Sequence, residues 1–284
     1  MRMLAKLGMA TLFACGLVAT TISTTGAQAP PAVTKKSKVK VLLPQDDAEL
    51  KIEDKATKAT GKERTFDTPA LDVAKTYEYK LTAEWKPNNY TIMTRNKSAV
   101  FKGGEDVTID LTKDDATDKA MIRYVPTPDD IVTEMLKLAV IKKDDIVFEP
   151  GCGDSRMTIA AVKAGAKKGI AIDIDPERIT ESKANIKAAK LEDKIDLRLG
   201  DALDIKDFSD ATVVLLYMGN EFNALIRPNL WKQLKPGTRI VSHRFTMGDW
   251  KPEKTLNIKG EDGDDYEVHL WTITEEDKKK VEKK

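Results

Sequence analysis

The stretch Asp145-Ile-Val-Phe-Glu-Pro-Gly-Cys-Gly-Asp-Ser-Arg156 decides the fold of the carboxyl half of this chain. Its apolar start predicts a buried parallel strand, and Gly151 and Gly153 let the chain turn sharply and bring bare backbone against a ligand. A second apolar run, residues 169–172, ends in Asp173, at about the spacing that lets a strand-turn-helix-strand unit present a carboxylate to a ribose diol. The pattern therefore predicts a site for a cofactor that contains adenosine.

The glycine spacing separates two classes of cofactor site. A dinucleotide site needs a further glycine three residues after Gly153, and Arg156 stands there instead. The pattern that remains, acid-x-Gly-x-Gly with Glu149 as the acid, resembles the first motif of the class I S-adenosylmethionine-dependent methyltransferases. Ser155 occupies a position where that family often has another glycine. The resemblance implies S-adenosyl-L-methionine as the cofactor.

The same resemblance implies roles for residues at the ends of three strands. In this family the glycine loop lies along the methionine part of the cofactor, and the acid after the second strand binds both ribose hydroxyls. The acid after the third strand, here residues 195–201, lies beside the adenine amino group. Cys152 is interpreted as a small packing residue of the loop, not as a nucleophile. The cofactor-binding residues implied in this chain are Glu149, Gly151, Cys152, Gly153, Asp173, Ile174, Asp201, Ala202 and Tyr124.

The rest of the carboxyl half predicts a complete α/β domain. Apolar runs at residues 212–217 and 239–245 suit central parallel strands, and residues 255–258 and 266–273 alternate as an antiparallel hairpin. Between the first two runs, apolar residues recur at helical spacing, with Pro228 expected to break or restart the helix. We expect a doubly wound, Rossmann-like sheet of seven strands, mostly parallel, with the cofactor at the carboxyl ends of its first strands.

Two further segments resemble one subgroup of this family in particular. Residues 123–128, Arg-Tyr-Val-Pro-Thr-Pro, and residues 241–250 are similar to bacterial methyltransferase-domain proteins related to the mitochondrial lysine methyltransferases of the ATP synthase ring subunit and of a nucleotide carrier. The prolines hold the lead-in extended, so that it can cross the cofactor pocket before a helix starts at Asp129. The alternative interpretation of these residues is an ordinary helix start, at which the prolines only mark the end of the preceding segment.

The fourth predicted strand places candidate catalytic residues at the mouth of this pocket. A lysine acceptor, with an ordinary pKa of about 10.4, must lose a proton before it attacks the methyl group. Tyr217 and Glu221 follow the strand and are the candidates to orient or deprotonate such an amine. His243, on the neighbouring strand, is more readily interpreted as a hydrogen-bonded structural residue. We single out no set of metal ligands.

The amino terminus indicates where the protein goes. A basic start, an uncharged apolar stretch and Ala27-Gln-Ala29 before two prolines are typical of a signal peptide at residues 1–29. The apolar stretch is short for a membrane span, which favours cleavage over anchoring. We therefore expect export to the periplasm or cell envelope, with residues 30–37 as a linker.

Residues 38–112 form a second predicted unit. Their alternating apolar and polar residues, separated by turn formers, predict an antiparallel β-sandwich with Tyr77, Tyr79, Leu81, Ala83 and Trp85 on its core face. The unit resembles a small uncharacterised β module of exported bacterial proteins, which implies a role in binding a protein or an envelope component. Residues 113–122 are expected to be a linker, 123–274 the methyltransferase domain and 275–284 a frayed charged tail.

The overall composition limits the function. The 284 residues carry a net charge of +1, and the 33% of charged residues interleave both signs, so no nucleic-acid partner is expected. The methyl acceptor is unknown from sequence, with a protein lysine or another amine implied by the resemblance. Because S-adenosylmethionine is made in the cytosol, an exported two-domain scaffold with a catalytically silent methyltransferase fold stays open as the alternative.

Overall fold

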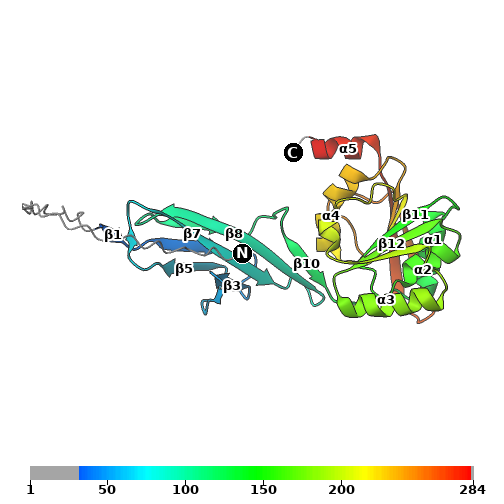
Figure 1. The fold of residues 1–284 in the computed structure, drawn as a ribbon, viewed down its shortest axis with the longest axis horizontal. Helices are drawn as coiled ribbons and strands as arrows, with labels where there is room; N and C mark the ends of the chain where they lie inside the picture. The colour runs from blue at the N-terminus through cyan, green and yellow to red at the C-terminus, as the bar shows by residue number, and fades with distance from the viewer. Residues whose placement is uncertain (1–31, 283–284) are drawn as a thin grey trace, which may run out of the picture.

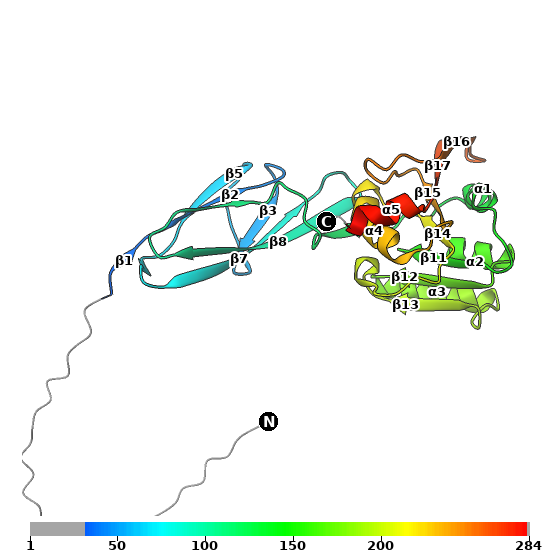
Figure 2. The ribbon, with the colours of Figure 1, turned by 90° about the horizontal axis from the view of Figure 1, so that it is seen from above.

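The computed structural model describes residues 32–282, which form two units placed end to end (Figures 1 and 2). An all-β unit comes first in the chain and an α/β unit second. The expected signal peptide lies outside the described residues. Within residues 32–282, no helix is long and apolar enough to cross a membrane.

The α/β unit is built on one seven-stranded sheet in the order β13-β12-β11-β14-β15-β17-β16. The first five strands run parallel, and β17 and β16 are antiparallel additions at one edge. This confirms the predicted doubly wound sheet with a reversed edge hairpin. The strands are β11 (Ile146–Pro150), β12 (Lys168–Asp173), β13 (Ile195–Leu199), β14 (Val213–Leu216), β15 (Arg239–His243), β16 (Lys254–Lys259) and β17 (Asp265–Thr272).

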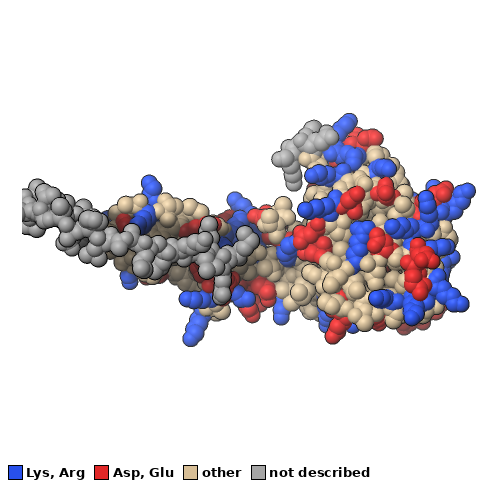
Figure 3. Space-filling model, in the orientation of Figure 1, with Lys and Arg blue, Asp and Glu red and all other residues tan. Residues whose placement is uncertain are grey.

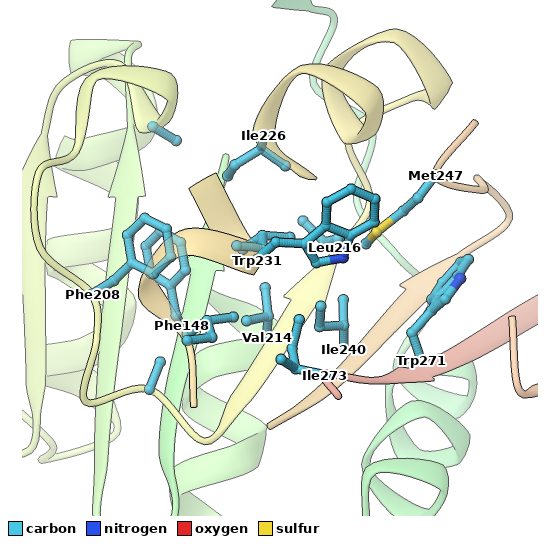
Figure 4. Packing of buried hydrophobic residues seen from close by; sticks show 14 of the residues in the cluster. Phe148, Phe208, Val214, Leu216, Ile226, Trp231, Ile240, Met247, Trp271 and Ile273 are labelled. Atoms are coloured by element: carbon cyan, nitrogen blue, oxygen red, sulfur yellow. The ribbon is translucent and has the colours of Figure 1, made fainter. Parts of the chain in front are cut away.

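Helices cover both faces of this sheet because successive residues of a strand point to opposite sides. In β14, Val213 and Leu215 belong to the core under α1 and α2, whereas Val214 and Leu216 belong to the core under α4. Figure 4 shows the second of these cores, in which the rings of Phe148 and Phe208 stack with centroids 4.8 Å apart. The helical elements are α1 (Asp129–Ala139), α2 (Arg156–Lys163), α3 (Pro176–Ala188), η1 (Ala202–Asp204), α4 (Asn220–Gln233) and α5 (Glu275–Glu282).

Two helices show how local sequence sets their course. Helix α3 begins at Pro176 because the Asp175 carboxylate accepts a hydrogen bond from the Glu177 N–H at 2.8 Å, as its position before a proline predicts. Helix α4, in contrast, runs unbroken through Pro228. The expected break is absent because Phe222, Ile226 and Leu230 are buried on one side of the helix and hold both halves on the sheet.

The all-β unit encloses its own core between two sheets. A five-stranded sheet has the order β10-β8-β7-β3-β4 and a three-stranded sheet the order β5-β2-β9, while β1 and β6 pair separately. The predicted all-β unit is confirmed, although β2 pairs parallel with β9, so the smaller sheet is mixed where an antiparallel one was expected. The strands are β1 (Thr34–Lys35), β2 (Lys38–Leu42), β3 (Glu49–Ile52), β4 (Lys55–Ala56), β5 (Glu63–Asp67), β6 (Leu71–Asp72), β7 (Thr76–Trp85), β8 (Thr91–Lys102), β9 (Val107–Asp110) and β10 (Lys119–Ile122).

Segments expected to be linkers or a tail are ordered parts of the fold. Residues 30–37 contain β1, and residues 113–122 contain β10, which pairs antiparallel with β8. The pairing of β10 is fixed by the residue before it, since the buried Asp118 carboxylate accepts hydrogen bonds from two guanidinium nitrogens of the buried Arg95. In the expected tail, α5 docks on α4 because the Lys278 Nζ donates to three carbonyl groups at the end of that helix.

Candidate functional site

A cavity of about 680 Å³ lies at the carboxyl ends of the first strands of the α/β sheet. Three segments after β11, β12 and β13 line it, together with Tyr217 and Met218 after β14. Residues 120–127, which include most of the proline-containing segment before α1, also line it, and Lys86 and residues 88–92 of the all-β unit form part of its wall. Its size suits a small-molecule cofactor.

The glycine loop after β11 is held in a conformation that favours glycine. Gly151 has a φ of 67° and Gly153 a φ of 55°. A Cβ atom at Gly153 would lie 2.2 Å from the ring of Tyr124, so this glycine is what lets the lead-in lie against the loop. Ser155 has a φ of 61°, which accounts for the frequent glycine at this position, and its hydroxyl donates to Ser182 Oγ at 2.8 Å. The strained turn is therefore held by a buried hydrogen bond.

Glu149 lies under this loop with 1% of its surface exposed. Its Oε2 accepts hydrogen bonds from the Thr158 N–H at 2.8 Å and from the Thr158 hydroxyl in the first turns of α2. Burial raises the pKa of Glu149 to about 8, against the effect of these two bonds. The side chain is therefore mostly protonated at neutral pH in the structure described, and it lines the cavity.

Asp173 ends β12 with its carboxylate fixed toward the cavity. Its Oδ2 accepts from the Gly153 N–H at 2.8 Å and its Oδ1 from the Asp175 N–H at 2.9 Å. Burial raises the pKa of Asp173. A carboxylate offers about four acceptor positions, so each oxygen keeps one for a diol. Ile174, exposed by 53%, continues the cavity wall as an apolar surface.

Asp201 follows β13 and is bound from two directions. Its Oδ1 accepts from the Leu203 N–H at 2.9 Å, and its Oδ2 accepts from the Lys119 Nζ at 3.0 Å. The same ammonium group also binds Asp204 at 2.8 Å. Ala202 is buried beside them. Sequence reasoning missed Lys119, because nothing local in residues 113–122 signals that this segment returns to the α/β unit.

These groups fit S-adenosyl-L-methionine. The loop provides close backbone approach, Asp173 provides acceptors for a diol, and Ile174 and Ala202 provide apolar surface for a base. The carboxylates of Asp154 and Asp173 line the cavity beside the loop, which suits a cofactor that carries a sulfonium and an ammonium group. Cys152 also lines the cavity, but it is only 3% exposed and burial raises the pKa of its thiol, in keeping with a packing role. Eight of the nine implied cofactor residues line the cavity, and the ninth, Gly153, lies under Tyr124.

Tyr217 lines the cavity after β14, in a part of the wall that we call the acceptor end, and its ring belongs to an aromatic group. Its ring stacks on His243 with centroids 4.0 Å apart and on Phe245 at 5.5 Å. Burial raises the pKa of Tyr217, so the phenol keeps its proton at neutral pH and can orient an amine more readily than deprotonate it. His243 is 1% exposed and its Nδ1 lies 3.1 Å from the Thr127 hydroxyl. Burial lowers the pKa of His243 to about 3, which keeps it neutral, as expected of a structural residue.

Glu221, the second catalytic candidate, is not among the residues that line the cavity and faces the all-β unit. Its Oε1 accepts from the Asn88 Nδ2 at 3.2 Å and its Oε2 from the Thr91 hydroxyl at 3.4 Å. Sequence reasoning missed these two residues and their neighbour Tyr90, all of which line the cavity. The sequence marks residues 86–90 only as a turn between two strands, and a contact across more than a hundred residues leaves no local signal.

The matches of this chain to known proteins described next are all to methyltransferases. The sequence model described as the ANTKMT methyltransferase domain matches residues 149–254. The chain is 40% identical over 156 residues to a protein-lysine N-methyltransferase of Saccharolobus islandicus (strain REY15A), a match that covers 54% of this chain and 95% of that relative. It is also 37% identical over 133 residues to a ribosomal protein L11 methyltransferase of Alkaliphilus oremlandii (strain OhILAs), covering 39% of this chain and 42% of the relative.

A solved structure gives the same fold. An RNA methyltransferase from Salinibacter ruber, in complex with S-adenosyl-L-homocysteine, is 41% identical to this chain with a TM-score of 0.50. The match covers 53% of this chain and 95% of that one. The sheet order, the glycine loop with its carboxylates and these matches lead to one conclusion: the chain belongs to the class I S-adenosylmethionine-dependent methyltransferases, in the family of the ANTKMT methyltransferase domain.

Proposed function

We propose that this methyltransferase transfers the methyl group to the side-chain amine of a lysine in a protein. The observation that carries the proposal is the 40% identity to a protein-lysine N-methyltransferase along 95% of that relative. The acceptor end of the cavity supports it, because the phenol of Tyr217 lines this end and the carboxylate of Glu221, just outside the lining, binds the lining residue Asn88. Both groups suit an amine.

The chemistry asks little of the protein beyond position and one proton. S-adenosyl-L-methionine, when bound, supplies an activated methyl group on a sulfonium. The lysine nitrogen must arrive without its proton, and aromatic walls favour the neutral amine because they exclude water. Glu221, which binds the lining residues Asn88 and Thr91, is a carboxylate beside this end, and it would accept that proton through water. The nitrogen lone pair then forms the N–C bond while the S–C bond breaks and its electron pair goes to sulfur.

Methyl transfer from radiolabelled S-adenosyl-L-methionine to the proteins of a bacterial lysate tests this proposal. After acid hydrolysis, the label should appear in methylated lysine. The full chain with Asp173→Ala is the matched control, because it removes the expected ribose contact and leaves the acceptor end unchanged. Label on carboxyl groups or on small molecules would exclude lysine as the acceptor. Absence of transfer together with cofactor binding would favour a catalytically silent scaffold.

RNA is the second candidate acceptor, because the Salinibacter ruber relative is described as an RNA methyltransferase. Charge argues against it in this chain. The net charge is +1, and Figure 3 shows basic and acidic side chains interspersed over the α/β unit on the face in view. RNA binding draws on a concentrated basic surface. The same assay with total RNA distinguishes the two, since label that resists protease and is lost to ribonuclease would replace lysine by RNA.

We also propose that the mature protein works outside the cytosol, on the support of the amino-terminal sequence alone. Cell fractionation with amino-terminal sequencing should find a chain that starts at Pro30 in the periplasm or envelope. An intact amino terminus in the cytosolic fraction would contradict export. The all-β unit, in that compartment, is available to bind a protein or an envelope component.

A further inference from the structure

The hairpin that joins β7 to β8 places part of the all-β unit inside the methyltransferase pocket. Lys86 and residues 88–92 of this hairpin line the same cavity as the glycine loop and Tyr217. Figure 1 shows the long strands β7 and β8 running toward the α/β unit, with β10 between the two units. The wall they form lies at the acceptor end, because their side-chain contacts are with Glu221 and Phe245.

Hydrogen bonds of Asn88 hold the hairpin in the conformation that makes this contact. The Asn88 Oδ1 accepts from the Tyr90 N–H at 3.1 Å and from the Thr91 N–H at 2.8 Å, which closes the turn. The same side chain then donates from its Nδ2 to Glu221. Gly219, whose φ of 85° favours glycine, lies against the same group: a Cβ there would be in ordinary contact with Thr91 Oγ1 and the Tyr90 ring at 3.5 Å and with Glu221 Oε2 at 3.6 Å.

Tyr90 extends the aromatic group of the pocket across the boundary between the units. Its ring lies 5.3 Å from that of Phe245, which in turn stacks on Tyr217 at 5.5 Å. Tyr90 and Tyr217 both line the cavity. Burial and the nearby Glu221 raise the pKa of Tyr90, so its hydroxyl stays protonated. The acceptor end is therefore bounded by the phenols of Tyr90 and Tyr217, whose rings both pack against Phe245. The carboxylate of Glu221 lies beside them.

The position of the hairpin is fixed by the strand that links the units. β10 pairs with β8 from Thr91 to Thr94, and the Arg123 N–H donates to the Tyr90 carbonyl at 2.8 Å. Ala120 of β10 packs against the cores of both units. The buried pair of Arg95 and Asp118 holds the start of this strand. The hairpin is therefore joined to the site by strand pairing and by buried residues of β10, and not by an unpaired linker.

The relatives give this wall a separate origin from the catalytic core. A match that covers 95% of the Saccharolobus islandicus enzyme takes up only 54% of this chain. That relative therefore has no room for a counterpart of the whole all-β unit. The two proteins share the methyl-transfer domain. Selection of the acceptor by the hairpin would be a property that this chain has in addition to it.

We propose that the β7–β8 hairpin is the acceptor-selecting wall of the pocket and admits the side chain of lysine. Tyr90 and Tyr217 pack on its methylene stem, as aromatic rings do, while Glu221, held by Asn88 and Thr91 just behind the lining, places a negative charge near its amine. This proposal rests on the proposed function. Its specific content is that Tyr90 and Asn88, from outside the shared core, set the affinity for the acceptor and leave the affinity for the cofactor unchanged.

The test measures acceptor and cofactor affinity separately in the full chain. Tyr90→Ala should raise the half-saturating concentration of lysate acceptor protein by about tenfold, the value of one lost aromatic contact, and Tyr90→Phe should behave like the wild type. Binding of S-adenosyl-L-homocysteine, followed by calorimetry, should change less than twofold in both. Unchanged acceptor dependence in Tyr90→Ala, or an equal loss of cofactor affinity, would overturn the proposal.

A charge substitution gives a second, independent measurement. Asn88→Asp keeps the acceptor oxygen that closes the turn but places a like charge against Glu221, so it should also raise the half-saturating acceptor concentration. Asn96→Asp makes the same change at an exposed position of β8 and should have no effect. Equal behaviour of the two variants would overturn the proposal. A wild type that labels no lysine would instead reject the proposed function, and this inference with it.

Discussion

Replacing Glu149 by glutamine should change how the stability of the protein depends on pH. In the folded chain the pKa of Glu149 is raised by burial from 4.5 to about 8. An unfolded chain releases this proton near pH 4.5, whereas the folded chain holds it until about pH 8. The stabilisation is therefore complete below pH 4.5 and is lost as the pH rises through 8. At about 1.4 kcal/mol per pH unit, the loss between pH 5 and pH 8 is about 3 to 4 kcal/mol.

Denaturant unfolding at pH 5 and at pH 8 measures this effect. Tryptophan fluorescence reports the right unit, because Trp231, Trp250 and Trp271 all lie in the α/β domain. The free energy of unfolding of Glu149→Gln minus that of the wild type should rise by about 3 to 4 kcal/mol from pH 5 to pH 8. Glu192→Gln, at an exposed carboxyl, is the control and should leave the free energy of unfolding close to that of the wild type. A pH-independent difference for Glu149→Gln would refute the assignment of a buried, protonated carboxyl.

Four further predictions follow from the site and from the strand that joins the units. Asp173→Ala should weaken binding of S-adenosyl-L-methionine by about ten- to a hundredfold, because a charge-assisted contact to the diol is lost, and equal affinity by calorimetry would contradict this role. Tyr217→Phe should lower turnover with cofactor affinity unchanged, which single-turnover kinetics beside calorimetry would show. Turnover should rise from about pH 7 to pH 9 as more of the lysine becomes neutral, and a flat initial-rate profile would contradict a lysine that must lose its proton before it attacks. Arg95→Ala should cost about 3 to 5 kcal/mol of stability in thermal unfolding, because the Asp118 carboxylate stays buried without its partner.

The sequence predicted the α/β unit well because its signals are local. Gly151 and Gly153 adopt the positive φ that their spacing suggests, and the carboxylate of Asp173 lies where the strand-turn-helix-strand distance places it. Alternating residues in β14 face two cores, as the continuous apolar run requires. Each of these features depends on residues within about one structural unit of each other in the chain.

The parts that escaped prediction depend on contacts between distant residues. Residues 113–119 are mostly polar and resemble a linker, yet Lys119 binds Asp201 across 82 positions and Asn88 binds Glu221 across 133. Pairing of β10 is secured by a buried charge pair, and no periodicity reports such a pair in advance. For the same reason the all-β unit could not be recognised as part of the pocket, although its deletion would remove one wall of the cavity.

The shared strand β10 also sets an order for biosynthesis. The all-β unit leaves the ribosome first, but its five-stranded sheet stays incomplete until residue 122 has emerged, because β10 is the edge strand beside β8. The first strand of the α/β sheet begins only at Ile146, so the hairpin wall can be finished before any of its catalytic neighbours exist. The nascent α/β unit would then fold against a preformed template, with Tyr90 and Asn88 already in position to receive Glu221 and Phe245.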